Sequence, residues 1–414
     1  MTKKSDAPAI RFKGFSDAWE QRKLSEMCGT FEYGLNAAAK EFDGKNKYIR
    51  ITDIDDASRE FLLSDLSSPD ICLDGMSKYL LSSGDIVFAR TGASVGKTYI
   101  YRENDGIVYF AGFLIRAKVN QDNDAEFVFQ STLSPSYEKY IRITSQRSGQ
   151  PGVNAQEYSE YDLFAPSKEE QQRIGHFLRG IDNLITLHQR KFEKLTNVKK
   201  SMLEKMFPQN GSSYPEIRFK GFTDPWEQRK FSELVQIERG GSPRPIDDFI
   251  TDAPNGLNWV KIGDAPTQGN YITKTAEKIR PEGLSKTREV HPGDLILSNS
   301  MSFGKPYIMG IDGCIHDGWL LIRNTYGVFD LTFLCHLLGT PQMLSQYRSL
   351  AAGSTVNNLN KELVENTVVT IPSITEQRVL GDYLEQLDNL ITLHQRELEK
   401  LQNIKKSMLE KMFV

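Results

Sequence analysis

Residues 182–206 read DNLITLHQRKFEKLTNVKKSMLEKM, and residues 388–412 read DNLITLHQRELEKLQNIKKSMLEKM. The two stretches are identical at 21 of 25 positions, with an offset of 206 residues. Apolar residues in each copy recur at spacings of three and four, which is the pattern of a helical seam. A narrow apolar stripe needs a partner, so we predict that the two copies form a long helical pair. The predicted seams are Leu178, Ile181, Ile185, His188, Phe192, Leu195, Met202 and Met206, and Leu384, Leu387, Ile391, His394, Leu398, Leu401, Met408 and Met412.

A second block is also repeated. Residues 10–24, IRFKGFSDAWEQRKL, return as residues 217–231, IRFKGFTDPWEQRKF, with 12 of 15 positions identical. Because both blocks recur at nearly one period, the chain is a tandem of two similar units. The expected segments are an N-terminal recognition domain (1–166), a central helix with its linker (167–216), a C-terminal recognition domain (217–373) and a C-terminal helix (374–414).

The regions between the repeated blocks diverge but keep a common pattern. Residues 25–166 and 232–372 share only short marks, such as GD at 84–85 and 293–294, GK at 96–97 and 304–305, and VN at 153–154 and 356–357. In the first unit, β-rich runs at 47–54, 85–90, 97–101 and 107–119 predict strands, while 126–144 predicts a helix that Pro135 interrupts. In the second unit, we expect helices near 331–338 and 342–350. Each region is therefore expected to be α+β.

Composition restricts the class of protein. The net charge is −3, and no apolar run approaches the roughly 18 residues of a membrane span. The first residues lack a secretory signal, and the four cysteines show no paired spacing, so we expect a reduced cytoplasmic protein. Within residues 168–205, nine basic residues face five acidic residues. Any nucleic-acid surface must therefore be built from local basic clusters.

No catalytic or cofactor-binding pattern is present. The stretch GASVGKT at 92–98 has three residues between its first glycine and the GK pair, whereas a P-loop needs four. We expect a turn with Gly96 at positive φ, which could present Lys97, and Lys305 in the second unit, to phosphates. The histidines show no metal-ligand spacing, and no dinucleotide fingerprint is found. We therefore expect a protein that is not itself an enzyme and holds no metal.

Loops of the divergent regions carry Arg and Lys together with Asn, Gln, Ser and aromatic residues, which is the composition of DNA-contacting surfaces. Arg and Asn can contact guanine and adenine, whereas Lys more often meets phosphate. In the first unit, the candidate DNA contacts are Lys45, Lys47, Tyr48, Arg50, Arg90, Thr91, Ser94, Lys97, Arg142, Gln146, Arg147 and Asn154. In the second unit, they are Arg244, Trp259, Lys261, Asn299, Ser302, Lys305, Arg348, Asn357 and Asn358.

The repeated WEQRK block, the helix starts EQQRI (170–174) and EQRVL (376–380), and the paired tails resemble the DNA-specificity subunit of Type I restriction-modification systems. The resemblance covers essentially the whole chain. It implies two target-recognition domains of mixed α/β structure, separated by an antiparallel coiled coil with pseudo-two-fold symmetry. Each domain would read one half of an asymmetric, interrupted site in double-stranded DNA.

The resemblance also implies partners. Two methyltransferase subunits would dock on the helices, and endonuclease/translocase subunits would join them. S-adenosylmethionine, ATP and magnesium would be bound only by those partners. The residues expected at the methyltransferase interface are Gln171, Gln172, Arg173, Gln377 and Arg378.

Helix length would set the unread gap between the half-sites, because about 35 residues span roughly 50 Å. The sequence is also compatible with two other functions. One is a fused restriction or methyltransferase enzyme, and the other is a coiled-coil adaptor that binds no DNA.

Overall fold

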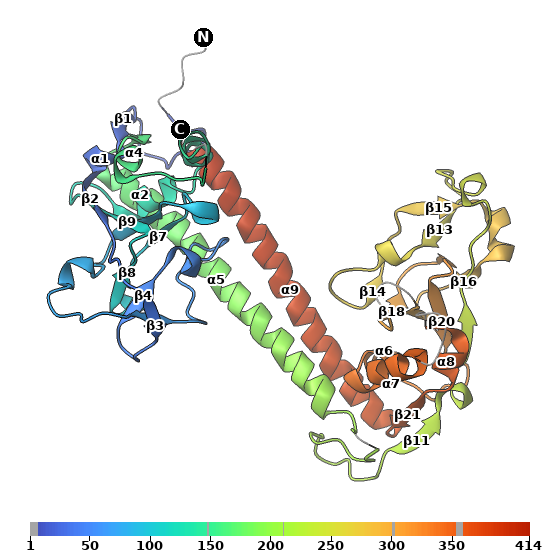
Figure 1. Cartoon of the computed structure of the whole chain (residues 1–414). Helices are drawn as coiled ribbons and strands as arrows, with labels where there is room; N and C mark the ends of the chain where they lie inside the picture. Colours follow the sequence, from blue (N-terminus) through green and yellow to red (C-terminus); the bar gives the residue numbers. More distant parts are fainter. Residues whose placement is uncertain (1–6, 147–148, 210, 300–302, 353–358) are drawn as a thin grey trace. The chain divides into compact units, whose positions relative to one another are not determined.

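The computed structural model (Figure 1) describes residues 7–146, 149–209, 211–299, 303–352 and 359–414. The chain divides into two compact units, one formed by residues 1–189 with 397–414, the other by residues 190–396. The two long helices α5 (Lys168–Lys205) and α9 (Ile374–Met412) each contribute a segment to both units. They are the repeated stretches of the sequence, so the helices expected there are confirmed.

The first unit contains the other elements up to α5. Its helices are α1 (Leu24–Met27), α2 (Ala125–Ser131), α3 (Pro135–Thr144) and α4 (Ala155–Ser159). Its strands are β1 (Glu20–Lys23), β2 (Cys28–Tyr33), β3 (Ala39–Glu41), β4 (Lys47–Ile49), β5 (Ser67–Pro69), β6 (Asp85–Ala89), β7 (Thr98–Ile100), β8 (Val108–Phe110), β9 (Leu114–Val119) and β10 (Asp162–Ala165). The main sheet has the antiparallel order β2-β9-β6-β7, while β4 and β8 pair in parallel.

The second unit follows the same plan. Its helices are α6 (Leu331–Leu338), α7 (Pro341–Ala352) and α8 (Lys361–Glu365). Its strands are β11 (Glu227–Lys230), β12 (Gln236–Arg239), β13 (Leu257–Val260), β14 (Tyr271–Ile272), β15 (Glu277–Ile279), β16 (Arg288–Val290), β17 (Leu295–Ser298), β18 (Pro306–Met309), β19 (Gly313–Ile315), β20 (Trp319–Arg323) and β21 (Val368–Ile371). The sheet β12-β20-β17-β18-β14 matches the main sheet of the first unit with one added strand, and β13 and β19 pair in parallel as β4 and β8 do.

Several sequence expectations about these elements are sharpened by the structure. The predicted helix at 126–144 is two helices, and Pro135 is the first residue of the second one, where its missing N–H costs nothing. The expected strand at 107–119 is split into β8 and β9 by a turn at 111–113. The expected strand at 47–54 is shorter, because Arg50 and Asp53 close a 3-10 turn after Ile49.

Within each unit, the two long helices run antiparallel. In the first unit, Lys405 near the end of α9 pairs with Asp182 near the start of α5, with Nζ and Oδ1 2.5 Å apart. In the second unit, Lys199 near the end of α5 pairs with Asp388 near the start of α9. Each unit's core therefore receives the end of one long helix and the start of the other.

The repeated N-terminal block explains why each long helix starts where it does. Arg11 makes two hydrogen bonds of 2.7 Å to the buried Glu170 in the first turn of α5, and Arg218 does the same to Glu376 in α9 at 2.7 and 2.8 Å. The EQRK residues form β1, which pairs with β10, and β11, which pairs with β21. We call this arrangement of arginine, glutamate and strand pair the clasp.

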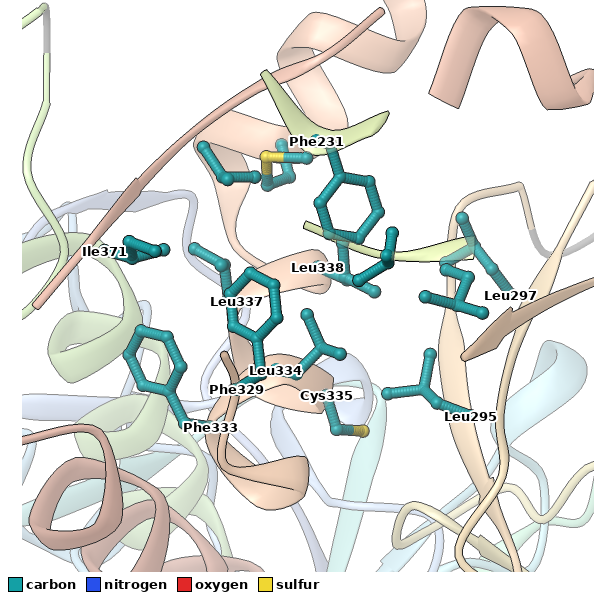
Figure 2. Close-up of a cluster of buried hydrophobic side chains, with 14 of the residues drawn as sticks. Phe231, Leu295, Leu297, Phe329, Phe333, Leu334, Cys335, Leu337, Leu338 and Ile371 are labelled. Atoms are coloured by element: carbon teal, nitrogen blue, oxygen red, sulfur yellow. The ribbon is translucent and has the colours of Figure 1, made fainter. Parts of the chain in front are cut away.

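The core of the second unit packs helix against sheet (Figure 2). Leu334, Cys335 and Leu338 of α6 lie toward Leu295 and Leu297 of β17, whereas Phe333 and Leu337 lie on the side of Ile371; Phe231 and Phe329 belong to the same cluster. Met206 and Phe207, at the end of α5, belong to the same cluster. In the first unit, Leu409 and Met412 of α9 take the corresponding place beside Trp19 and Phe127. Burial of these apolar side chains holds the helix ends in both units.

A close helix approach is repeated in both units. A Cβ on Gly175 would lie 2.5 Å from Oδ1 of Asp124, which caps α2, and a Cβ on Gly381 would lie 2.9 Å from Oδ1 of Asp330, which caps α6. Only glycine therefore fits at these two positions of the long helices.

Candidate nucleic-acid interface

The loops at one end of each main sheet share a backbone framework. In the first unit, the amide of Arg90 donates to the carbonyl of Phe113 at 3.1 Å, and its carbonyl accepts from Val153 at 2.9 Å. In the second unit, Asn299 makes the same two bonds, to Gly318 and from Leu359, each at 3.0 Å. Position 90 therefore corresponds to 299, 113 to 318, and 153 to 359.

This framework corrects one match made from the sequence. The Val153-Asn154 pair was matched to Val356-Asn357, but the structural counterpart is Leu359-Asn360. Asn154 and Asn360 both cap a short helix, α4 and α8, by accepting a hydrogen bond from the amide three residues on, at 2.9 Å in each unit. The sequence match failed because the motif is two residues long and the loop before it differs in length.

The turn that carries Lys97 and Lys305 has the predicted backbone. Gly96 has a φ of 83° and Gly304 a φ of 74°, and a Cβ on either would clash with the helix behind it, at Ile141 or Tyr347. The turn joins two antiparallel strands, so it is a hairpin and not a strand–loop–helix phosphate site. Nζ of Lys97 lies 2.5 Å from Oδ1 of Asp56, while Nζ of Lys305 lies over the ring of Tyr307.

The first unit exposes cations and aromatic rings along these loops. The guanidinium of Arg90 lies over the ring of Tyr33 at 5.1 Å, and Tyr33 and Phe113 are both exposed. Arg142 is exposed on α3, with Gln146 just beyond that helix and Asn154 at the start of α4. The half-exposed Thr91 forms a β-bridge with Gly152, which joins the two loops. Apart from Asn154, whose Oδ1 already caps α4, the exposed side chains named here are available to a ligand.

Other candidates of the first unit serve the fold. Tyr48 is buried and its hydroxyl donates to the carbonyl of Leu35 at 2.6 Å, so the expectation of a DNA contact is corrected here. Ser94 is also buried. Lys47 donates to the carbonyl of Asp105 at 2.7 Å, and Arg50 holds the carboxylate of Asp53 at 2.8 and 2.9 Å. Lys45 stays exposed.

The second unit shows a similar division. Trp259 is buried, with its ring edge-on to His316, so its predicted DNA contact is also corrected. Lys261 is half-exposed and its Nζ lies 2.5 Å from Oε1 of Glu277. Asn299 is buried and its Nδ2 donates to the main-chain oxygen of Asp317 at 2.9 Å, so it orders a loop and does not face a ligand. The sheet buries Trp259, and a loop hydrogen bond holds Asn299 inside; composition alone does not give either direction.

Arg244 and Arg348 are the exposed cations among the second-unit candidates. Arg348 lies on α7, as Arg142 lies on α3. The two arginines are 206 residues apart, which is the offset of the repeat. Arg147, Ser302, Asn357 and Asn358 lie outside the described residues.

The sequence did not point to Asp317, which lies near Arg244, to His316, which bonds to Asp317, or to Phe113 in the first unit. Asp317 and His316 are not among the cations and amides whose clusters predict a DNA contact. The sequence does offer one signal: apolar Ala111 precedes the GFLIR stretch, whereas His316 and Asp317 precede GWLLIR.

The residues expected at a partner interface divide in two. Gln171 and Gln377 are buried: each accepts from the amide of the aspartate that caps α2 or α6 (Asp124 at 3.0 Å, Asp330 at 2.9 Å) and donates to the carbonyl of the proline five residues before it. Their expected partner contact is therefore corrected, because they fix the start of each long helix. Gln172, Arg173 and Arg378 are exposed.

Within the described part of the chain, no group of three or more His, Cys, Asp or Glu side chains could hold a metal ion. Among these same residues, none of the helices has the length and apolar character that crossing a membrane requires.

Comparison with known proteins agrees with this architecture. The family described as "Type I restriction modification DNA specificity domain" matches twice, at residues 16–197 and 223–403. The specificity subunit of the Type I restriction enzyme MjaVIII of Methanocaldococcus jannaschii is 23% identical over 85% of this chain and 83% of its own length. The putative MjaX specificity subunit of the same organism is 22% identical over 94% of this chain and 92% of its own length.

Solved structures share the fold. The S subunit of a Type I restriction-modification system from M. genitalium superposes with a TM-score of 0.68, at 13% identity, and covers 99% of both chains. A chain from a structure of Type I system assembly and conformational transition has a TM-score of 0.51, at 18% identity, and covers 94% of this chain and 96% of that one. With two family matches that span most of its length and a duplicated framework to correspond to them, this chain belongs to the Type I restriction-modification DNA specificity family.

Proposed function

We propose that this chain is the sequence-reading subunit of a Type I restriction-modification complex. Residues 1–166 and 217–373 each read one half of an asymmetric, interrupted site in double-stranded DNA. The chain performs no chemistry itself. It directs methylation and restriction by partner subunits, in the cytoplasm where the DNA lies.

One observation carries this proposal. The two units share their backbone framework, bond by bond, at the loops described above, while the side chains on that framework differ. Arg90 and the exposed Phe113 stand at these positions in the first unit, whereas the second unit has the buried Asn299 and Gly318 there and exposes Arg244 instead. A shared scaffold with different exposed chemistry suits two domains that meet DNA similarly and read different bases.

The partners are proposed from the outer surface of the long helices. Besides Gln172, Arg173 and Arg378, two leucine pairs are exposed at equivalent places: Leu184 with Leu187 on α5, and Leu390 with Leu393 on α9. An apolar surface that occurs twice in one chain fits two copies of the same partner. These would be two methyltransferase subunits, with endonuclease/translocase subunits added to them. S-adenosylmethionine, ATP and magnesium would be held by these partners.

A domain exchange tests the reading function. Residues 25–161 are replaced by the equivalent region of another specificity subunit, which leaves β1, β10 and α5 in place, so the clasp is intact. The complex is then mapped by sequencing methylated DNA from cells that also express the modification subunit. We expect one half-site to change and the other to persist.

A reciprocal exchange of residues 232–367 serves as the matched control, because it keeps β11, β21 and α9. It should change the other half-site. If either exchange alters both halves, or neither, the assignment of one half-site to each unit is wrong.

A further inference from the structure

A polar corner of the second unit is built from three loops. They are the segment after β12 that contains Ser242 and Arg244, the turn between β19 and β20 that contains His316 and Asp317, and Asn299 after β17. The backbone amide of Gly241 donates to the carbonyl of Ile315 at 3.2 Å, which ties the first loop to the second. We call these five side chains the Arg244 corner.

Hydrogen bonds fix the carboxylate at the centre of this corner. The amide of Gly318 donates to Nδ1 of His316 at 2.9 Å, so that nitrogen carries no proton and Nε2 does. Nε2 then donates to Oδ1 of Asp317 at 2.9 Å, and the Ser242 hydroxyl donates to the same oxygen at 3.1 Å. One carboxylate oxygen is thus already occupied by two donors.

The other oxygen, Oδ2, faces Arg244, with Nη2 3.7 Å away. The Arg244 side chain is 84% exposed, whereas that of Asp317 is 29% exposed. The carboxylate is therefore fixed from behind and the guanidinium extends outward from it. A fixed counter-charge narrows the rotamers of an exposed arginine and so lowers the entropy that is lost when it binds.

The first unit has the same framework without this chemistry. Gly34 and Gly240 each donate to the first residue of β9 or β20, at 3.1 and 2.9 Å, and Phe113 corresponds to Gly318 as shown above. Counting along the chain from these anchors, Ala111 and Gly112 replace His316 and Asp317, and Ala38 replaces Arg244. The polar corner is therefore not needed for the fold.

We propose that Arg244, positioned by Asp317, reads a guanine in the half-site assigned to the second unit. The planar guanidinium offers two parallel N–H donors that match O6 and N7 of guanine in the major groove, and no other base presents two acceptors there. Asp317 acts as a positioning residue, since its free oxygen is directed at the arginine. This inference rests on the proposed function.

The test uses the full chain assembled with its modification subunit. The methylated site of the natural complex is mapped first. Methylation rates are then measured on duplexes that carry each single base-pair change across both half-sites. The variants are Arg244→Ala, Arg244→Lys and Asp317→Asn. Arg229→Ala is the control, because within the described residues its guanidinium pairs with the exposed carboxylates of Glu227 and Glu233.

For Arg244→Ala, we expect discrimination to fall about 5- to 150-fold at one G·C position in one half-site, with the rest of the site read as before. Lys lacks the planar fork, so Arg244→Lys should recover only part of this discrimination. Asp317→Asn keeps the size of the side chain and should weaken the same position less than Arg244→Ala does. The control should leave every position unchanged.

Three results would overturn the inference. They are unchanged discrimination in Arg244→Ala, a uniform loss of rate at all positions as for a phosphate contact, and a loss at an A·T position or in both half-sites. In each case the natural complex still methylates a two-part site, so the proposed function stands. If the natural complex shows no site preference at all, the proposed function fails, and the inference fails with it.

Discussion

The clasp offers a quantitative test of how the start of a long helix is held. Glu376 is 2% exposed and Arg218 is 15% exposed, and two hydrogen bonds of 2.7 and 2.8 Å join them. Arg218→Ala leaves a buried carboxylate without its cation, and such a change lowers the free energy of unfolding by roughly 3–5 kcal/mol. The indole of Trp226 still donates to the same carboxylate at 3.3 Å, so we expect the lower part of that range.

Hydrogen exchange of the amides at the start of α9 measures the free energy of local opening there, and so measures the cost of Arg218→Ala. Peptides from the start of α5 act as an internal reference, because Glu170 there is held by Arg11 in the equivalent pair. Arg229→Ala, which breaks only exposed ion pairs, should cost less than about 1 kcal/mol. A deficit for Arg218→Ala below about 1 kcal/mol would show that the clasp is not the main restraint.

Three further predictions address DNA binding, pH and the long helices. Arg142→Ala and Arg348→Ala should each reduce the salt dependence of duplex binding by about one released counterion, measured by fluorescence anisotropy across ionic strengths, and an unchanged slope would exclude phosphate contact. Burial acts to raise the pKa of Asp388, but the hydrogen bond from His336 and the charge of Lys199 outweigh it and hold this pKa below its usual value. Asp388→Asn should therefore destabilise the second unit at pH 7 by about 1–3 kcal/mol. This penalty should begin to shrink near the ordinary aspartate pKa of 3.8, where the unfolded chain takes up its proton, and should be lost as the pH falls through the lowered pKa of the folded chain. Urea unfolding at pH 7 and below this lowered pKa decides it, because an equal penalty at both contradicts the charge argument. Inserting one heptad into both α5 and α9 should lengthen the unread gap of the methylated site and keep both half-sites, and a map with changed half-sites at constant gap would contradict the role of helix length.

The fold was largely predictable because its main signals are local or repeated. The a/d spacing of 182–206 and its copy predicts the helices, and Pro135 marks the break between α2 and α3. The role of Gln171 and Gln377 could not be predicted in the same way. They follow a glutamate at the start of a charged helix, which is typical of an exposed surface, yet tertiary contacts with the caps of α2 and α6 bury them.

The candidate interface was predicted less well than the fold. Arg142 and Arg348 are exposed at equivalent positions, as a search for cations can find. Tyr48, Trp259 and Asn299 have the residue types of a DNA contact, but strand direction and a loop hydrogen bond place them inside. Asp317 was missed since its importance comes from the residues around it, which are far apart in sequence and are brought together only by the pairing of β12 with β20.

The distribution of repeated and divergent residues follows from where each unit needs specific contacts. The repeated residues close the clasp and pair across the long helices, and Gly175 and Gly381 leave room for the caps of α2 and α6. Most changes there would therefore leave a buried charge or a clash. One such contact already varies: Gln130 and His336 are one repeat apart, and both bind the aspartate of the long helix, at 2.7 and 2.9 Å. The exposed loop residues have no such constraint, and substitutions there usually change stability by less than about 0.5 kcal/mol. The chain can therefore change what each unit reads, as at Arg244 and Ala38, at little cost to the framework that holds both units.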